Sequence, residues 1–258
     1  IQDPGPAVSA ATMKAALSAL AAAAILGATA CQAAETSNPP QARQTTMTTA
    51  QQALSATQQA LVPIAAFAAV GDMAKLNRAL NQALDAGLTV SDAREVLVQL
   101  YAYTGFPRSL NALGELMKVH DERKQRGIQD AAGKEPGPLP ADYDALAVGT
   151  ENQTKLVGAP VKGALFDFAP AIDQYLKAHL FGDIFVRDNL DWKSRELATI
   201  AALAAMQGVE AQLRSHLQIG LNLGLTPAQL RQLPQVFEAQ GETAAADRLQ
   251  AALQATLK

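Results

Sequence analysis

The chain contains a long internal repeat, and this feature limits the possible folds more than any other. The stretch LNRALNQALDAGLTVSDAR (Leu76–Arg94) aligns without gaps with LRSHLQIGLNLGLTPAQLR (Leu213–Arg231), at an offset of 213 − 76 = 137 residues. The same offset places Gly71 opposite Gly208. A repeat of this length predicts two structural units of one fold, each built from the same series of elements.

Both copies carry the signals of one helix ending and another beginning. An amphipathic stretch stops at a glycine (Gly87, Gly224), a leucine follows, and a threonine comes next (Thr89, Thr226). Glycine takes the left-handed conformation after a helix at little cost, and threonine accepts a hydrogen bond from a free backbone N–H of the next turn. An Asp or Gln three residues after each threonine completes a capping pattern. We therefore predict a helix–turn–helix at both places.

The apolar spacing predicts helices in the rest of both copies. Apolar residues recur at steps of three and four, as in Leu76, Leu80 and Leu84. Aromatic residues are only 5% of the chain, and no long segment alternates with period two, so the material for a sheet is lacking. The predicted fold class is all-α.

Composition divides the chain into segments. The first helical unit is expected over residues 48–130 and the second over residues 166–258. Between them, residues 131–165 include the Pro- and Gly-rich run GKEPGPLPADYD and are predicted to form a linker. Residues 34–47 are polar, contain Pro39-Pro40 and are predicted to form a tether.

The N-terminal region has the pattern of an export signal. Residues 13–33 begin with Met-Lys, continue with an uncharged apolar run of roughly 15 residues and end in small residues, and a bilayer span needs about 20. Residues 1–12 are then upstream sequence. We expect a periplasmic protein with no membrane span. Two alternatives stay open: a lipid anchor through Cys31, and an Ala-rich helix that stays on the protein.

Charge and rare residues exclude several classes of function. A formal net charge of −3 gives no positive field for phosphate backbones, so no nucleic-acid partner is expected. A single Cys rules out an internal disulfide and a multi-Cys metal site, and three His leave little for a His-rich one. We predict no metal and no cofactor.

Two stretches resemble a known family. The run FGDIFVRDNLDWKSRELATIAALAAMQGVEAQLRSHLQIGLNLGLTPAQL (Phe181–Leu230) is similar to the core of the carboxymuconolactone decarboxylase family, within the alkylhydroperoxidase D-like superfamily. GLTVSDAREVLVQLYAYTGFPRSLNAL (Gly87–Leu113) is similar to the family's other recurrent stretch. The resemblance implies two tandem alkylhydroperoxidase D-like helical units that form a pseudo-symmetric bundle. It also implies a homo-oligomer, either trimer-like or a dimer of tandem units.

The resemblance directs attention to Glu196 and His216. The peroxidase branch of the superfamily uses a Cys-x-x-Cys pair, and this chain has no Cys between these two residues. A Glu at the start of an apolar helix and a His one turn before Gly220 are suited to acid/base chemistry on a small carboxylate or lactone: decarboxylation, isomerisation or lactone chemistry. We take Glu196 and His216 as candidate catalytic residues of a possible lyase. A helix-terminal charge and a satisfied core imidazole are the structural alternative.

Four further residues are candidates for binding the substrate. Arg195 or Arg214 would hold a substrate carboxylate, although each could equally be a surface cation. Tyr101 and Tyr103 could place a phenol in the site, but residues two positions apart face different sides of a helix, so at most one is expected there.

The first unit lacks these groups. At the offset of 137, the positions that match Arg195, Glu196 and His216 are Gln58, Gln59 and Ala79. We therefore expect one competent site in the chain, to which the first unit could lend a helix. An exported enzyme would not readily meet a cytoplasmic catabolite, so a non-catalytic periplasmic small-molecule-binding or assembly module remains the alternative function.

Overall fold

The computed structural model describes residues 53–257, and within that range every regular element is a helix. The all-α prediction is thus confirmed. The predicted export signal, the tether over residues 34–47 and Cys31 lie outside the described residues. No helix of the described part is long and apolar enough to cross a membrane.

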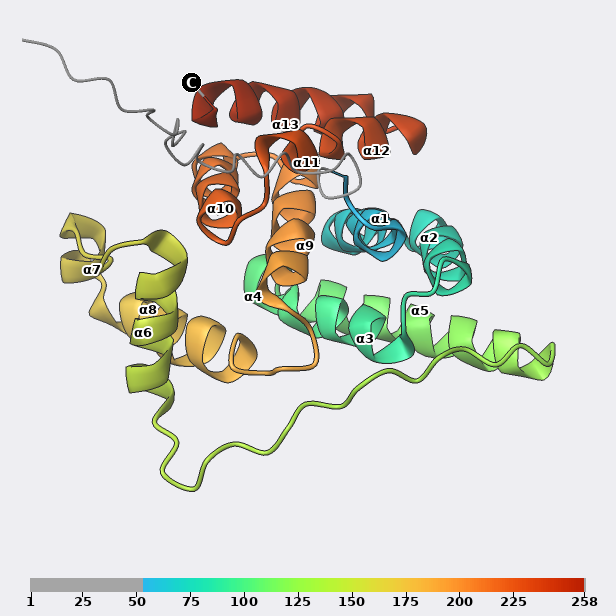
Figure 1. Ribbon diagram of the computed structural model, residues 1–258, viewed down its shortest axis with the longest axis horizontal. Helices are drawn as coiled ribbons and strands as arrows, with labels where there is room; N and C mark the ends of the chain where they lie inside the picture. The colour runs from blue at the N-terminus through green and yellow to red at the C-terminus, as the bar shows by residue number, and fades with distance from the viewer. Residues whose placement is uncertain (1–52, 258) are drawn as a thin grey trace, which may run out of the picture. The chain divides into compact units, whose positions relative to one another are not determined.

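Figure 1 traces the order of the helices along the chain. They are α1 (Ala56–Val70), α2 (Met73–Asp85), α3 (Val90–Gln99), α4 (Tyr101–Thr104), α5 (Phe106–Gln125), α6 (Ala145–Val157), α7 (Ala164–Phe168), α8 (Pro170–Tyr175), the π-helical η2 (Leu176–Ile184), α9 (Trp192–Ala205), α10 (Glu210–Asn222), α11 (Pro227–Leu230), α12 (Leu233–Ala239) and α13 (Thr243–Thr256).

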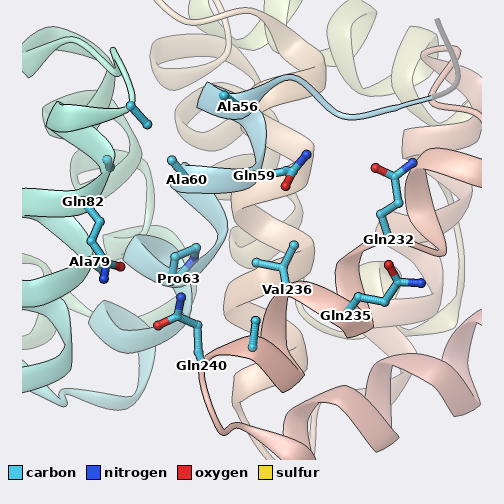
Figure 2. Close-up of a pocket in the computed structure, with 13 residues that line it drawn as sticks. Ala56, Gln59, Ala60, Pro63, Ala79, Gln82, Gln232, Gln235, Val236 and Gln240 are labelled. Atoms are coloured by element: carbon cyan, nitrogen blue, oxygen red, sulfur yellow. The ribbon is translucent and has the colours of Figure 1, made fainter. Parts of the chain in front are cut away.

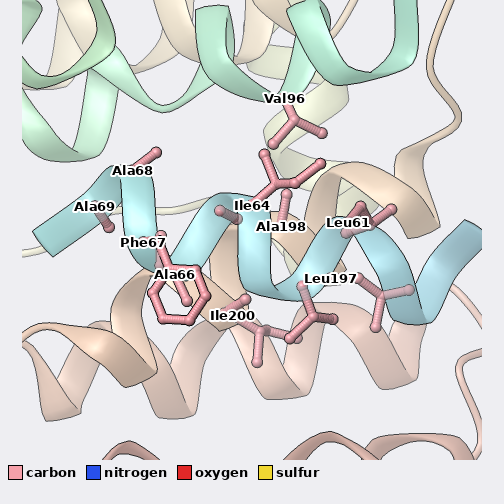
Figure 3. Close-up of a cluster of buried hydrophobic side chains, with 14 of the residues drawn as sticks. Leu61, Ile64, Ala66, Phe67, Ala68, Ala69, Val96, Leu197, Ala198 and Ile200 are labelled. Atoms are coloured by element: carbon pink, nitrogen blue, oxygen red, sulfur yellow. The ribbon is translucent and has the colours of Figure 1, made fainter. Parts of the chain in front are cut away.

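The core forms where the two units meet. The central helix of the first unit, α1, packs along its counterpart α9, and both are apolar on nearly all sides. Figure 3 shows Leu61 and Ile64 of α1 beside Leu197 and Ile200 of α9, all of them buried. Helices that are apolar all round must be covered on every side. The remaining helices of both units supply that cover.

The two predicted helix–turn–helix signals are confirmed. Gly87 and Gly224 have φ angles of 90° and 86°, the left-handed conformation expected after a helix. Thr89 caps α3 and Thr226 caps α11, each in a reciprocal capping box with the residue three positions later. The repeat in sequence is therefore a repeat in local structure.

The first helix of the repeat has a spacing one residue shorter than the rest. The N-caps Ser55 of α1 and Asp191 of α9 differ by 136 positions, and LVPIAAFAA (Leu61–Ala69) matches LATIAALAA (Leu197–Ala205) at the same spacing. Gln207, between the end of α9 and Gly208, is the extra residue that restores the offset of 137. The placement of Gln58 and Gln59 opposite Arg195 and Glu196 is therefore wrong by one position.

The segment expected as a linker contains a packed helix. Residues 128–140 are free of helix, as the Pro and Gly content predicts, but α6 lies inside the 131–165 range and packs against η2. A Cβ on Gly149 of α6 would lie 1.8 Å from the backbone oxygen of Lys177, so only glycine permits this approach. With η2, α6 forms a second apolar cluster around Leu156 and Phe181.

A buried Glu–His pair as the candidate active site

Glu196 and His216 meet inside the second unit. Glu196 lies in the second turn of α9, which the side chain of Asp191 caps, and His216 lies in the middle of α10. Their side chains are 2.7 Å apart, between His216 Nδ1 and Glu196 Oε2. Glu196 is 0% exposed and His216 is 8% exposed. The imidazole is thus the member of the pair that reaches toward solvent.

This contact fixes the orientation of the imidazole. An ionised carboxylate can only accept a hydrogen bond, so pairing with it assigns the donor role to Nδ1. The other ring nitrogen, Nε2, is then left with a free lone pair for a proton. A carboxylate that orients a His is the arrangement that general-base sites use.

The first unit contributes Tyr103 to the same place. Its ring lies edge-on to the His216 ring, with 5.6 Å between the ring centroids. Burial raises the pKa of the Tyr103 hydroxyl, the negative charge of Glu196 raises it further, and the neighbouring Thr199 side chain opposes the shift. The phenol therefore stays protonated and can act as a donor.

Two buried polar atoms of this group lack a hydrogen bond. Among the described residues, neither Oε1 of Glu196 nor the hydroxyl of Tyr103 has a partner of normal hydrogen-bond geometry. An unsatisfied buried polar group costs about 1–3 kcal/mol, and such groups are rare outside sites with a role. The cluster thus has one acceptor and one donor free for a ligand atom.

The structure separates the two tyrosines proposed for substrate binding. Tyr101 stacks on Phe106, with 4.4 Å between the ring centroids, and lies 5.5 Å from the His179 ring. Only Tyr103 contacts the ring of His216. Two positions along α4 turn the side chains to different neighbours, as expected for residues two apart.

Neither arginine is placed to hold a substrate carboxylate at this pair. Arg195 is 0% exposed, and its guanidinium is engaged by Glu95, Gln99 and the backbone oxygen of Arg187. Arg214 is exposed on α10, two residues before His216 and hence on another side of the helix.

A buried ionic network next to the pair was not found from the sequence. Glu95 of α3 is 1% exposed and accepts hydrogen bonds from Arg187, Asn189 and Arg195. Burial alone would raise the pKa of Glu95, but these hydrogen bonds outweigh it and hold the pKa below its ordinary value. The available signal was an acidic residue directly before the apolar stretch Val96–Val98 of α3.

The same network joins α3 to α9. Gln99 donates from its amide to the backbone oxygen of Arg195 and to the hydroxyl of Thr199, at 3.0 and 2.8 Å. The first unit therefore supplies Tyr103 and the supports of α9, so the second unit's site is assembled from both units. Within residues 53–257, no group of three or more His, Cys, Asp or Glu side chains could hold a metal ion.

The corrected register defines the equivalent place in the first unit. At the 136-residue spacing of the central helices, and at 137 elsewhere, the positions that match Arg195, Glu196, His216 and Tyr103 are Gln59, Ala60, Ala79 and Gln240. No acid–base pair forms there.

The protein is thus a duplicated all-α protein. It has one buried Glu–His pair, in its second unit, and no cysteine among the described residues. Residues 39–117 and 170–258 match the carboxymuconolactone decarboxylase family, and the chain belongs to that family. The two matched regions agree with a tandem arrangement of two units. No curated protein matches the chain.

Proposed function

We propose that this protein is a carboxymuconolactone decarboxylase-like enzyme that moves a proton on and off a carbon next to the carbonyl of a small lactone. The observation that carries the proposal is the 2.7 Å contact between Glu196 and His216, beside a buried acceptor and a buried donor that have no partner of normal hydrogen-bond geometry within residues 53–257. Proton transfer of this kind needs one base with a free lone pair and one donor near the developing oxyanion.

Each of the three side chains has a role in this reaction. His216 takes the proton from the carbon through Nε2, and the electron pair moves onto the carbonyl oxygen to give an enolate. The hydroxyl of Tyr103 donates a hydrogen bond to that oxygen. The imidazolium, stabilised by Glu196, then returns the proton to the same carbon or to the far end of the conjugated system. The second outcome is an isomerisation.

The charges favour an uncharged substrate over a carboxylate. The carboxylate of Glu196 is buried beside His216, and a second anion next to it would be repelled strongly at low dielectric. Arg195 is committed to Glu95, and Arg214 lies on the surface. Isomerisation of an uncharged lactone therefore fits the charges of this site better than decarboxylation of an anion.

We also propose that the reaction takes place in the cell envelope, and the support for this is the predicted export signal. Residues 13–33 have the basic start, apolar run and small residues of a secretory signal, and Cys31 is the position for a lipid anchor if one is present. We also keep the homo-oligomer as part of the proposal. Mass spectrometry of the mature N-terminus and light scattering of the purified protein test these two points.

The test uses α-angelica lactone, a β,γ-unsaturated lactone that isomerises by the proposed proton shift. In deuterated buffer, nuclear magnetic resonance follows both conversion to the conjugated lactone and deuterium uptake. We expect His216→Ala to lower the rate by about 10²–10⁴-fold, the usual contribution of a general base. Tyr103→Phe removes one donor to the enolate and costs less than His216→Ala.

A matched control separates catalysis from folding. Ser215 is the exposed neighbour of His216 on α10, so Ser215→Ala leaves the rate unchanged. Far-ultraviolet circular dichroism checks that each variant is folded. If Glu196→Gln and His216→Ala both isomerise the lactone at the wild-type rate, the pair is a core feature. The non-catalytic binding module is then the better description.

A further inference from the structure

A cavity occupies the place in the first unit that corresponds to the Glu–His site. It measures about 660 Å³ and lies among α1, α2 and α12. Cavities of about 300–1,000 Å³ are the size that small-molecule sites use. Its lining includes Ala60 and Ala79, the two positions that match Glu196 and His216 (Figure 2).

The cavity exists because large side chains are replaced by small ones. Ala60, Ala79 and Ala86 stand where the second unit has Glu196, His216 and Leu223. The surrounding helices keep their places, since α1 packs against α9 and α2 as α9 packs against α1 and α10. Truncation of side chains on a fixed scaffold leaves open volume.

The lining also lacks the charged side chains that surround the Glu–His pair. Gln59, Gln232 and Gln240 stand at the positions that match Arg195, Glu95 and Tyr103, the residues around the Glu–His pair, and no residue that lines the cavity is ionisable. A neutral wall offers nothing to offset the desolvation of a charged ligand. The ligand that fits is therefore uncharged.

Amide side chains give the cavity both donors and acceptors. Gln59 and Gln232 are held by the backbone of Leu54, through its carbonyl oxygen and its N–H at 2.9 and 3.1 Å. Among the described residues, no protein group bonds the side-chain amides of Gln82, Gln235 and Gln240. In Figure 2, Gln82 and Gln240 extend toward the same space beside Pro63.

We propose that this cavity is a second ligand site, which binds an uncharged cyclic amide or a similar ring with adjacent donor and acceptor groups. The carbonyl of such a ring accepts from one glutamine amide, and its N–H donates to another, while the alanines and Pro63 cover its apolar side. The degenerate unit is thus a binding unit, and the site does not depend on the Glu–His chemistry.

The test titrates the full isotope-labelled chain with 3,4-dihydro-2-quinolinone, a benzo-fused lactam, to about 10 mM, because ligands of this size bind in the millimolar range. Nuclear magnetic resonance reads the glutamine side-chain amides directly, and Gln240→Leu and Gln82→Leu assign their signals. We expect saturable shifts of these signals. The anion 3-phenylpropanoate, of similar size, binds at least about tenfold more weakly.

Variants locate the binding. Ala79→Leu fills the cavity and lowers the lactam affinity by at least about tenfold. Ala86 is exposed at the rim, so Ala86→Phe blocks the mouth even if Ala79→Leu fails to fold. Gln218→Leu, on the surface of α10, leaves binding unchanged. Binding also persists in His216→Ala, which separates this proposal from the lactone isomerase.

Three results overturn the proposal. They are glutamine amide signals that do not move, an anion that binds as well as the lactam, and lactam binding that both Ala79→Leu and Ala86→Phe leave intact.

Discussion

The two units have the same helices but differ in what those helices enclose. In the second unit, α9 and α10 bury Arg195, Glu196 and His216. At the matching positions the first unit has Gln59, Ala60 and Ala79, and α1 and α2 still pack in the same way. The fold therefore does not require the polar residues. Burial of charges is weak evidence for stability, so their presence in one unit favours a role in binding or chemistry.

Each unit also completes the other's site. Tyr103, near the end of α4 in the first unit, contacts His216, and Gln240, at the end of α12 in the second unit, lines the cavity beside Ala79. The exchange follows from the pairing of α1 with α9, in which α3 and α4 contact α9, and α12 contacts α1. A substitution in one unit can therefore alter the site in the other unit.

The largest difference between the units is expected in how much their buried hydrogen-bond networks contribute to the free energy of unfolding. Glu95→Gln leaves Arg195 buried without its carboxylate, which costs about 3–5 kcal/mol in the free energy of unfolding. Gln232→Leu, at the matching position, removes neutral hydrogen bonds, among them the acceptor for the Leu54 N–H and the donor to the Ala228 carbonyl, and costs about 1–2 kcal/mol. Urea denaturation of both variants measures the two values.

The pH dependence of the free energy of unfolding shows whether the negative charge of Glu95 causes the larger destabilisation of Glu95→Gln. The pKa of Glu95 is lowered in the folded state by its hydrogen bonds with Arg187, Asn189 and Arg195, against the effect of burial. Its stabilisation is therefore present above the ordinary Glu pKa and is lost as the pH falls through the lowered value. Glu95→Gln should flatten this acid limb, and Gln232→Leu should keep it. Equal flattening in both variants would contradict the assignment.

The corrected register can be tested by transplanting the pair into the first unit. Ala60→Glu combined with Ala79→His places the two groups as Glu196 and His216 are placed, and a double-mutant cycle should give a favourable coupling of about 1–3 kcal/mol. Gln59→Glu combined with Ala79→His follows the uncorrected offset of 137 and should give a coupling near zero. Thermal unfolding of the singles and doubles supplies the cycle.

The opposite order of the two couplings would restore the ungapped alignment. Single Ala60→Glu is expected to destabilise the protein, because it buries a carboxylate without a partner. The double-mutant cycle subtracts the destabilisation of each single variant from that of the double variant, so this cost does not enter the coupling energy.

Much of the fold could be predicted because its signals are local. The all-α class follows from the apolar spacing, and the caps at Thr89 and Thr226 follow from a residue type and its neighbour three positions later. The linker prediction missed α6, because its helical signal is weak beside the Pro and Gly content of the same segment. The position of α6 depends on η2, a contact that spacing does not encode.

The candidate site was predicted only in part, for the same reason. Glu196 and His216 could be chosen by residue type and position, and the structure brings them within a hydrogen bond. The commitment of Arg195 to Glu95 needs α3 of the other unit, and a sequence read along one unit does not contain that contact. The one-residue shift was hidden because Gln207 introduces it just after an Ala-rich helix, in which neighbouring registers look alike.

The smallest difference between the units is expected at the caps. Thr89 and Thr226 each accept a hydrogen bond from the N–H three residues later, both at 3.1 Å. The two earlier donors of α3 are bonded by the carbonyls of residues 131 and 132, and α11 begins with a proline that has no N–H. Each threonine therefore satisfies one backbone N–H at the start of its helix. Thr89→Ala and Thr226→Ala should each cost about 1 kcal/mol in urea denaturation, and a loss confined to one unit would mean that its turn is stabilised by contacts the repeat does not share.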